Sequence, residues 1–277
     1  MAEGVRVSLA RAKALAPASQ RAFSLVLGAV VGDAAAVRCH WQYDAQKLRA
    51  ALKGKEAAFS TEAHNPFYRV ADGRNSCYGD QLRCVLASLA KTHGSIDAGD
   101  AAKVLRERMT APDYEATAEV RRTRAAYADD QKARAGPVAG PWRHGTIERF
   151  LAGEVDDADA SADAVLRALP VAAFLAALRP EVGDAELLRD VDTAVTLTQR
   201  NAAARSHAAA VSIAAARLVS GAATTPRDAI DQASKCAPVA SDARETFEQC
   251  LGAADALDFD GAVGNIKEFM GSKKLIA

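Results

Sequence analysis

The longest apolar stretch of the chain reads AFSLVLGAVVGDAAAV over residues 22–37 and predicts a helix inside the protein. Alanine is the best helix former, because it loses no side-chain entropy when a helix forms. Gly28, Gly32 and Asp33 interrupt the apolar run, which is expected to be too short to span a bilayer. We therefore expect a buried helix, in which Gly28 and Gly32 let a neighbouring helix approach closely.

Helical periodicity continues along the rest of the chain. Residues 203–219 are rich in alanine and poor in charge, as in a central helix, and further helices are expected over 241–257 and 259–270. Sustained strand-like alternation is hard to find, so the sequence predicts an all-α protein. One helix face is indicated by apolar residues at i, i+3, i+4 and i+7, namely Leu82, Val85, Leu86 and Leu89.

The chain is expected to form a single domain. No linker rich in Gly, Ser or Pro divides the 277 residues. We predict one multi-helix bundle over residues 21–277, preceded by a poorly ordered N-terminal extension over residues 1–20. Two loops within it stand out, over residues 59–79 and 136–145, and loops of such length tend to carry function.

The composition argues against some classes of partner. Lys plus Arg and Asp plus Glu both number 35, so the formal net charge is zero. Proteins that bind nucleic acid or anionic membranes usually carry a basic excess, so we expect neither partner. The five cysteines include no Cys-x-x-Cys pair, and residues 1–20 contain no apolar signal segment. Both features favour reduced thiols and a cytoplasmic location.

Asp33, at the end of the first apolar stretch, is the first candidate for a functional site. A carboxylate buried without a partner costs several kcal/mol, so Asp33 must cap a helix, form an ion pair or face a cleft. His40 and Trp41 follow in the segment HWQYD, residues 40–44. The two residues suit either a packed pair or a ligand site, and packing is favoured when they are considered alone.

A second candidate runs from the first loop into a helix. The segments NPFY, residues 65–68, and SCYGDQ, residues 76–81, bring polar groups to a predicted helix N-terminus. Free N–H groups and the helix dipole favour anionic ligands there, although Ser76 or Asp80 would also serve as an ordinary cap. A third segment, DVDT at residues 190–193, looks like a metal motif. Its two aspartates point to different sides of a helix, so we interpret it as a solvated helix face.

Taken in order, these segments resemble the ADP-ribosylglycohydrolase family, and its J-crystallin-like branch most of all. The resemblance rests on GAVVGDAAA followed by HWQYD, on NPFY and SCYGDQ, and on TQRN at residues 198–201. It covers roughly residues 22–266 and implies an all-α orthogonal bundle with a central cleft. In catalytic members of the family, two Mg²⁺ ions in that cleft engage the ribose, and hydrolysis releases ADP-ribose from a protein side chain or a small molecule.

The resemblance also implies specific departures from the catalytic pattern. Cys77, Tyr78 and Gly79 stand where the family has a metal-binding Thr-Asp-Asp run, and His40 stands near an acidic position. The sequence ends before an Asp-rich motif is reached, so we expect a domain that is short at its C-terminus. Too few carboxylates are left for two divalent ions. We therefore assign no metal ligands and expect Mg²⁺ only if a residual metal site survives.

Three functions stay open at this point. The first is an ADP-ribosylglycohydrolase-fold protein with a degraded di-metal site, weakly active or inactive, that binds ADP-ribose or a related nucleotide. The second is an active hydrolase of ADP-ribosylated substrates with a rebuilt site, in which Asp80 or His40 is the general acid/base. The third is a structural, crystallin-like protein. The candidate ligand-binding residues are Asp33, Trp41, Tyr78 and Gln81.

Overall fold

The computed structural model describes residues 11–42, 44–52, 62–125, 136–161 and 163–236. Within these ranges the regular secondary structure is helical apart from two strands of two residues each, so the predicted all-α class is confirmed. The helices expected over 241–257 and 259–270 lie outside the described residues. In chain order the elements are α2 (Pro17–Ala36), η1 (Val37–Cys39), α3 (Ala45–Leu52), β1 (Tyr68–Arg69), α4 (Cys77–Lys91), α5 (Ala98–Met109), α6 (Pro112–Ala125), β2 (Val138–Ala139), α8 (Gly145–Leu151), α9 (Asp163–Leu178), α10 (Asp184–Val195), α11 (Ala202–Ser220) and α12 (Pro226–Ser234).

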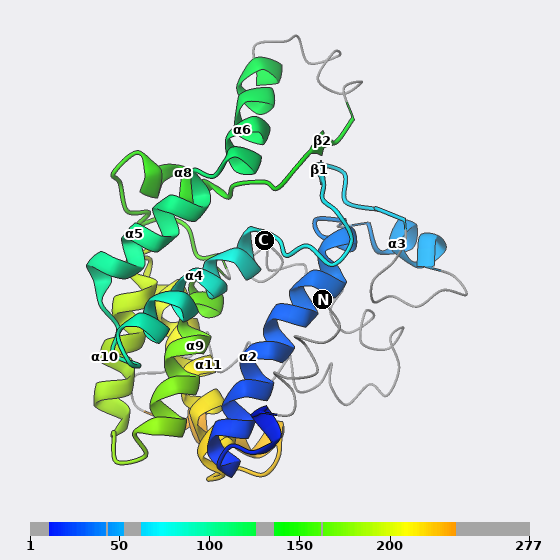
Figure 1. Ribbon diagram of the computed structural model, residues 1–277. Coiled ribbons are helices and arrows are strands. Elements are labelled where there is room, and N and C mark those ends of the chain that lie inside the picture. Colours follow the sequence, from blue (N-terminus) through cyan, green and yellow to red (C-terminus); the bar gives the residue numbers. More distant parts are fainter. Residues whose placement is uncertain (1–10, 43, 53–61, 126–135, 162, 237–277) are drawn as a thin grey trace.

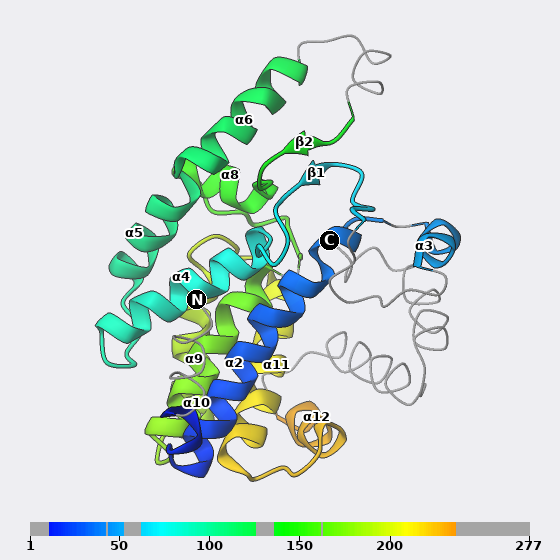
Figure 2. The same cartoon turned by 45° about the vertical axis from the view of Figure 1, so that its right-hand side comes forward.

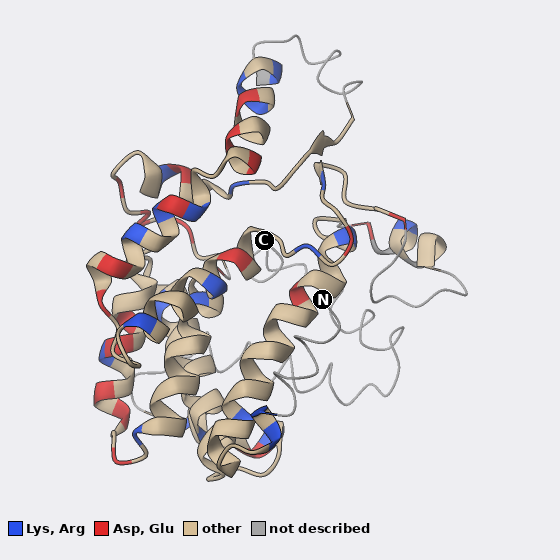
Figure 3. Ribbon diagram, in the orientation of Figure 1, with Lys and Arg blue, Asp and Glu red and all other residues tan. Residues whose placement is uncertain are grey.

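The hydrophobic core lies around α9. Figures 1 and 2 show α2, α9, α10 and α11 running side by side, and α4 packs across α9 and α2. The predicted apolar face of α4 enters this core, where Leu82, Val85 and Leu89 are buried against α9 and α10. Burying one such side chain stabilises the fold by about 1.5–3 kcal/mol. In Figure 3 the inner helices α2 and α9 carry few charged residues, whereas the outer helices α5, α6 and α10 carry many.

The two predicted loops are joined by a small parallel sheet. Tyr68 of β1 pairs with Val138 of β2, and the backbone N–H of Val138 donates to the carbonyl of Phe67 at 2.8 Å. Both strands lie at the upper end of the molecule in Figure 1, next to α6. The sheet therefore holds the loop that contains Phe67 beside the loop that contains Trp142.

Helix α2 differs from its prediction in burial. Ala34 is its one fully buried residue, while Leu27 and Val31 are exposed. The expectation of a fully buried helix is therefore wrong for the face that carries these side chains. A Cβ atom added at Gly28 or Gly32 would meet no described atom within 4 Å, so the predicted close approach of a neighbouring helix is also wrong among the described residues.

Helix α2 is also longer than predicted. It begins at Pro17, four residues before the expected domain start at residue 21, and its helical path continues through η1. The segment Pro17–Cys39, which is longer than the apolar run over residues 22–37, is long and apolar enough to cross a membrane by length and composition. A signal sequence and the mostly buried core helix of a soluble protein pass the same test. Here 11% of the tested window is buried, and α2 packs along α9 and α11.

Candidate functional site

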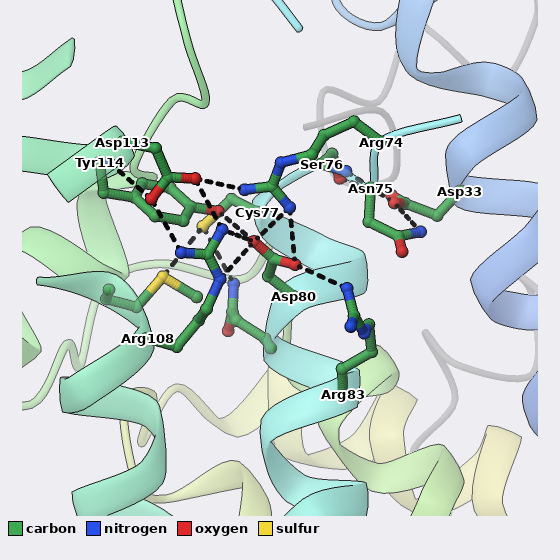
Figure 4. Close-up of polar contacts among 12 residues, drawn as sticks. Asp33, Arg74, Asn75, Ser76, Cys77, Asp80, Arg83, Arg108, Asp113 and Tyr114 are labelled. Atoms are coloured by element: carbon green, nitrogen blue, oxygen red, sulfur yellow. Dashed lines mark hydrogen bonds and ion pairs between the residues drawn. The ribbon is translucent and has the colours of Figure 1, made fainter. Parts of the chain in front are cut away.

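Asp33 of α2 meets the N-terminus of α4. Its Oδ2 accepts hydrogen bonds from the backbone N–H of Ser76 at 2.8 Å and from Nδ2 of Asn75 at 2.9 Å. The Ser76 hydroxyl donates to the other carboxylate oxygen and accepts from the backbone N–H of Tyr78 at 3.1 Å, which makes Ser76 the N-cap of α4. Figure 4 shows this contact between α2 and α4. The carboxylate is thus paired at the positive end of a helix dipole, one of the arrangements open to it from the sequence.

Gly79 makes that contact possible. A Cβ atom at this position would lie 2.8 Å from Nδ2 of Asn75 and closer still to Oδ2 of Asp33. Real Cβ atoms do not approach other atoms so closely, so any side chain here would push Asp33 and α4 apart. The pair Tyr78-Gly79 therefore has a structural reason in this chain, whatever the family carries at these positions.

Trp41 lies at the centre of a group of rings that we name the aromatic site: Trp41, Phe67, Tyr68, Tyr78, Trp142, His40 and His144. The Trp41 ring lies 5.2 Å from Phe67, 5.7 Å from Tyr68 and Trp142 and 5.5 Å from His144, centroid to centroid. The Trp41 backbone has φ +59°, a conformation that a bulky residue adopts only at a cost. Such strain gathers at functional sites, where the surrounding structure holds it in place.

His40 lies on the Asp33 side of the aromatic site. Its Nδ1 is 3.3 Å from the Tyr68 hydroxyl, and its ring meets the edge of Tyr78. Burial lowers the pKa of His40, and the attraction of Asp33 only partly opposes this effect. Burial likewise raises the pKa of Tyr68, so the phenol keeps its proton. A neutral imidazole next to a neutral phenol can accept a proton, which is what a general base requires.

His144, on the other side of Tyr78, is held by a buried aspartate. Its ring centroid is 4.0 Å from that of Tyr78, and its Nδ1 is 3.1 Å from Oδ1 of Asp163 at the start of α9. Burial would raise the pKa of Asp163, but His144 and Arg167 outweigh it and lower the pKa. Asp163 therefore stays ionised, and it fixes the orientation of the imidazole.

Gln81 supports Asp163 rather than the ring group itself. Its Nε2 donates to Oδ2 of Asp163 at 2.7 Å, and its Oε1 accepts from Arg167, whose side chain is fully buried. Arg167 also donates to Oε1 of Gln199 at 2.8 Å, and burial lowers its pKa to about 10. Gln81, which was predicted to bind ligand, therefore acts on His144 through Asp163. Both the nitrogen and the oxygen of its amide form hydrogen bonds there.

Asp80 lies on a different side of α4 from Asp33, facing α5 and α6 (Figure 4). Its side chain is 1% exposed and forms ion pairs with Arg108 at 2.8 Å and Arg74 at 3.2 Å. It also accepts a hydrogen bond from the Tyr114 hydroxyl at 3.0 Å. A carboxylate enclosed by two guanidinium groups and a phenol holds helices together. We therefore assign Asp80 to the packing of α4 rather than to the acid/base role expected from the sequence.

The third predicted segment is only partly solvated. Asp192 is exposed and forms an ion pair with Arg205 at 2.6 Å, as expected for a surface position. Asp190 is 8% exposed in total, so the expectation of a solvated face is wrong for this residue. The two carboxylates pair with different arginines, because Asp190 contacts Arg189 at 3.2 Å.

The described residues do not fit a pair of magnesium ions. Among them no group of three or more His, Cys, Asp or Glu side chains is placed to hold a metal. Asp33 is the carboxylate of the aromatic site, and its oxygens accept hydrogen bonds from Ser76 and Asn75. Cys77, in the position expected for a ligand, is buried with its Sγ 3.9 Å from the Met109 sulfur, and burial raises its pKa. Hard cations require several oxygen ligands, which this set does not provide.

The sequence reasoning missed part of the site. Trp142 and His144 stand in the second predicted loop, but nothing in the sequence joined them to Trp41. Asp163 and Arg167 lie four residues apart on α9, a spacing that puts both on one helix face. That spacing of opposite charges in an apolar helix is the signal that could have found them, because buried charges need partners.

Comparison with known proteins agrees with the fold and the motifs. The family profile described as ADP-ribosylglycohydrolase matches residues 15–273. Crystallin J1A of Tripedalia cystophora is 36% identical over 78 residues, which is 28% of this chain and 24% of that crystallin. Crystallin J1B of the same organism is 39% identical over 75 residues, 27% of this chain and 23% of the relative. The chain belongs to the ADP-ribosylglycohydrolase family, and part of it is similar to the two J1 crystallins.

Proposed function

We propose that this protein binds an ADP-ribosyl group, or a related nucleotide, at the aromatic site without two bound magnesium ions. The observation that carries the proposal is Trp41, held at positive φ among four rings while its buried indole Nε1 has no partner in the described part of the chain. Family membership supports ADP-ribosylated molecules as the ligand class.

Two further unpartnered polar atoms belong to residues that contact Gln42 and Tyr68, neighbours of Trp41 in the chain or in the aromatic site. Nε2 of His64 and Nδ2 of Asn65 are also buried without a partner among the described residues. His64 is close by, because its carbonyl accepts from the Gln42 side chain at 3.4 Å, and Oδ1 of Asn65 accepts from the backbone N–H of Tyr68 at 3.3 Å. A buried polar group without a partner costs about 1–3 kcal/mol. Ligand hydroxyl or phosphate oxygens would remove that cost, while aromatic faces suit a flat base or the apolar face of a sugar.

Each predicted site residue except Asp80 has a role in this proposal. Trp41 and Tyr78 contact the ligand, and His40 accepts a hydrogen bond from a ligand hydroxyl. Asp33 holds the start of α4 in place, and Gln81 acts through Asp163 on His144. The protein is then a binding member of the family, weakly active or inactive in hydrolysis, because its di-metal site is degraded.

A second candidate function is hydrolysis with a rebuilt site. The observation in its favour is the lowered pKa of His40, which keeps the imidazole neutral near pH 7. In that reaction His40 takes a proton from water as the water attacks the ribosyl carbon, and the leaving group takes up a proton as its bond to that carbon breaks. The crystallin relatives favour a third reading, a structural protein without a ligand.

Calorimetric titration with ADP-ribose separates these functions. We expect binding in EDTA and in Mg²⁺ with the same affinity, and we expect Trp41→Ala to remove it. Phe23→Ala, on α2 and away from the aromatic site, is the matched control and should bind as wild type. An absence of heat in both buffers would defeat the proposal. Release of ADP-ribose from modified protein in EDTA, lost in His40→Gln, would establish the hydrolase instead.

A further inference from the structure

A separate hollow of about 670 Å³ opens between α6 and the β1–β2 pair. Three arginines of α6 line it, Arg121, Arg122 and Arg124, together with Phe67 and Trp142 on the opposite side. Among the described residues of the lining, Glu148 is the one acidic side chain, so three positive charges face one negative charge there. A hollow of this size suits a small organic ligand, and its charge favours an anion.

The arginines differ in how much of their charge is already neutralised. Arg122 forms an ion pair with Glu119 at 2.7 Å, and Arg121 forms one with Glu148 at 3.4 Å. Arg124 forms no ion pair with a carboxylate among the described residues, and its guanidinium donates a hydrogen bond to the carbonyl of Gly136 at 2.6 Å. Arg124 therefore contributes a positive charge that is available to a ligand.

The aromatic wall adds a flat surface to this charge. The Cζ atom of Arg121 lies 3.8 Å from the centroid of the Trp142 ring, so the guanidinium group covers one face of the indole. Phe67 is 42% exposed. A guanidinium group over tryptophan and an exposed phenyl ring together present faces against which a nucleobase can stack.

We propose that this hollow is a second ligand site, which takes the phosphate of a nucleotide on Arg124 and Arg121 and the base of that nucleotide against Phe67. The site is distinct from the aromatic site, since Phe67 and Trp142 form the wall between the hollow and Trp41. Its existence does not depend on the function proposed for Trp41.

Titration calorimetry with inorganic phosphate and with AMP at low salt tests the site. AMP should bind about tenfold more tightly than phosphate, because its base adds a stacking contact. Arg124→Gln should weaken both ligands about tenfold, since it removes a charge-assisted hydrogen bond to the phosphate. Arg189→Gln, an exposed arginine on α10, is the matched control and should bind as wild type.

Glu148→Gln should change the ligand affinity in the opposite direction. Removing this carboxylate frees Arg121 and should tighten the binding of both ligands severalfold, a result that misfolding cannot produce. Equal affinities of wild type and Arg124→Gln would overturn the proposal, as would weaker binding in Glu148→Gln. AMP binding that is lost in Trp41→Ala but unchanged in Arg124→Gln would place the nucleotide in the aromatic site and also overturn it.

Discussion

Replacing Gly79 by alanine tests how Asp33 holds α2 against α4. The added methyl group would overlap with Oδ2 of Asp33 and lie 2.9 Å from Cβ of Asn75, so the carboxylate must move away. Asp33 then loses hydrogen bonds from Ser76 and Asn75, and bonds to a charged group are worth about 1.5–3 kcal/mol each. Alanine in place of glycine returns about 1 kcal/mol in helix propensity. The net destabilisation expected is about 3 kcal/mol.

Thermal unfolding measures this change directly. A loss of about 3 kcal/mol should lower Tm by about 6 to 12 °C in a chain of this size. Gly32→Ala on α2 is the control, because no described atom lies within 4 Å of its Cβ position, and it should raise Tm slightly. The double variant Gly79→Ala with Asp33→Ala should lose less than the sum of the two single variants, since both act on one contact. A Gly79→Ala protein as stable as Gly32→Ala would refute the reasoning.

Three further predictions concern charged side chains. Asp80→Asn should lower the stability by about 1–3 kcal/mol, because the hydrogen bonds that this buried carboxylate accepts are weakened while Arg74 and Arg108 keep their ion pairs with Asp113. The same change at Asp192 should cost under about 1 kcal/mol in urea unfolding. Arg167→Met should lower Tm strongly, because Gln81, Gln199 and Asp163 lose a buried partner. A Tm within about 2 °C of wild type, which corresponds to a loss of about 1 kcal/mol or less, would contradict the buried network. The hydrogen bond from Arg108 lowers the pKa of Asp113 to about 2, below the unfolded value of about 3.9, so this pair stabilises the fold above about pH 4 and the contribution is lost as pH falls towards 2. Asp113→Asn should flatten this part of a pH titration of Tm, and an unchanged acid limb would show that other carboxylates produce it.

The fold class could be predicted from local sequence patterns, and the errors in that prediction have a physical cause. Alanine content and the spacing of Leu82, Val85 and Leu89 were enough to predict the all-α class and the face of α4 that is buried. The burial of α2 was predicted from its apolar composition, but composition does not say how many neighbours a helix has. Leu27 and Val31 are exposed although they are as apolar as the core residues of α9.

Only separate parts of the candidate site could be predicted from the sequence. Asp33, His40, Trp41 and Tyr78 were predicted because each stands in a short motif, and the structure brings them to one end of α2 and α4, while their role in ligand binding stays a prediction. Their partners come from far along the chain, and pairing of that kind leaves no local signal. For Asp80 the sequence was misleading in another way. A carboxylate at a helix N-terminus suggested an acid/base role, but arginines from other elements enclose it in the structure.

Counting metal ions in the presence of ligand tests the central claim most directly. Mn²⁺ in place of Mg²⁺ can be titrated into the protein with saturating ADP-ribose and followed by electron paramagnetic resonance, which distinguishes free from bound ions. Our account predicts that the Mn²⁺ remains free while ADP-ribose stays bound through the aromatic site. Two tightly bound Mn²⁺ ions per chain, with ADP-ribose affinity that disappears in EDTA, would contradict it.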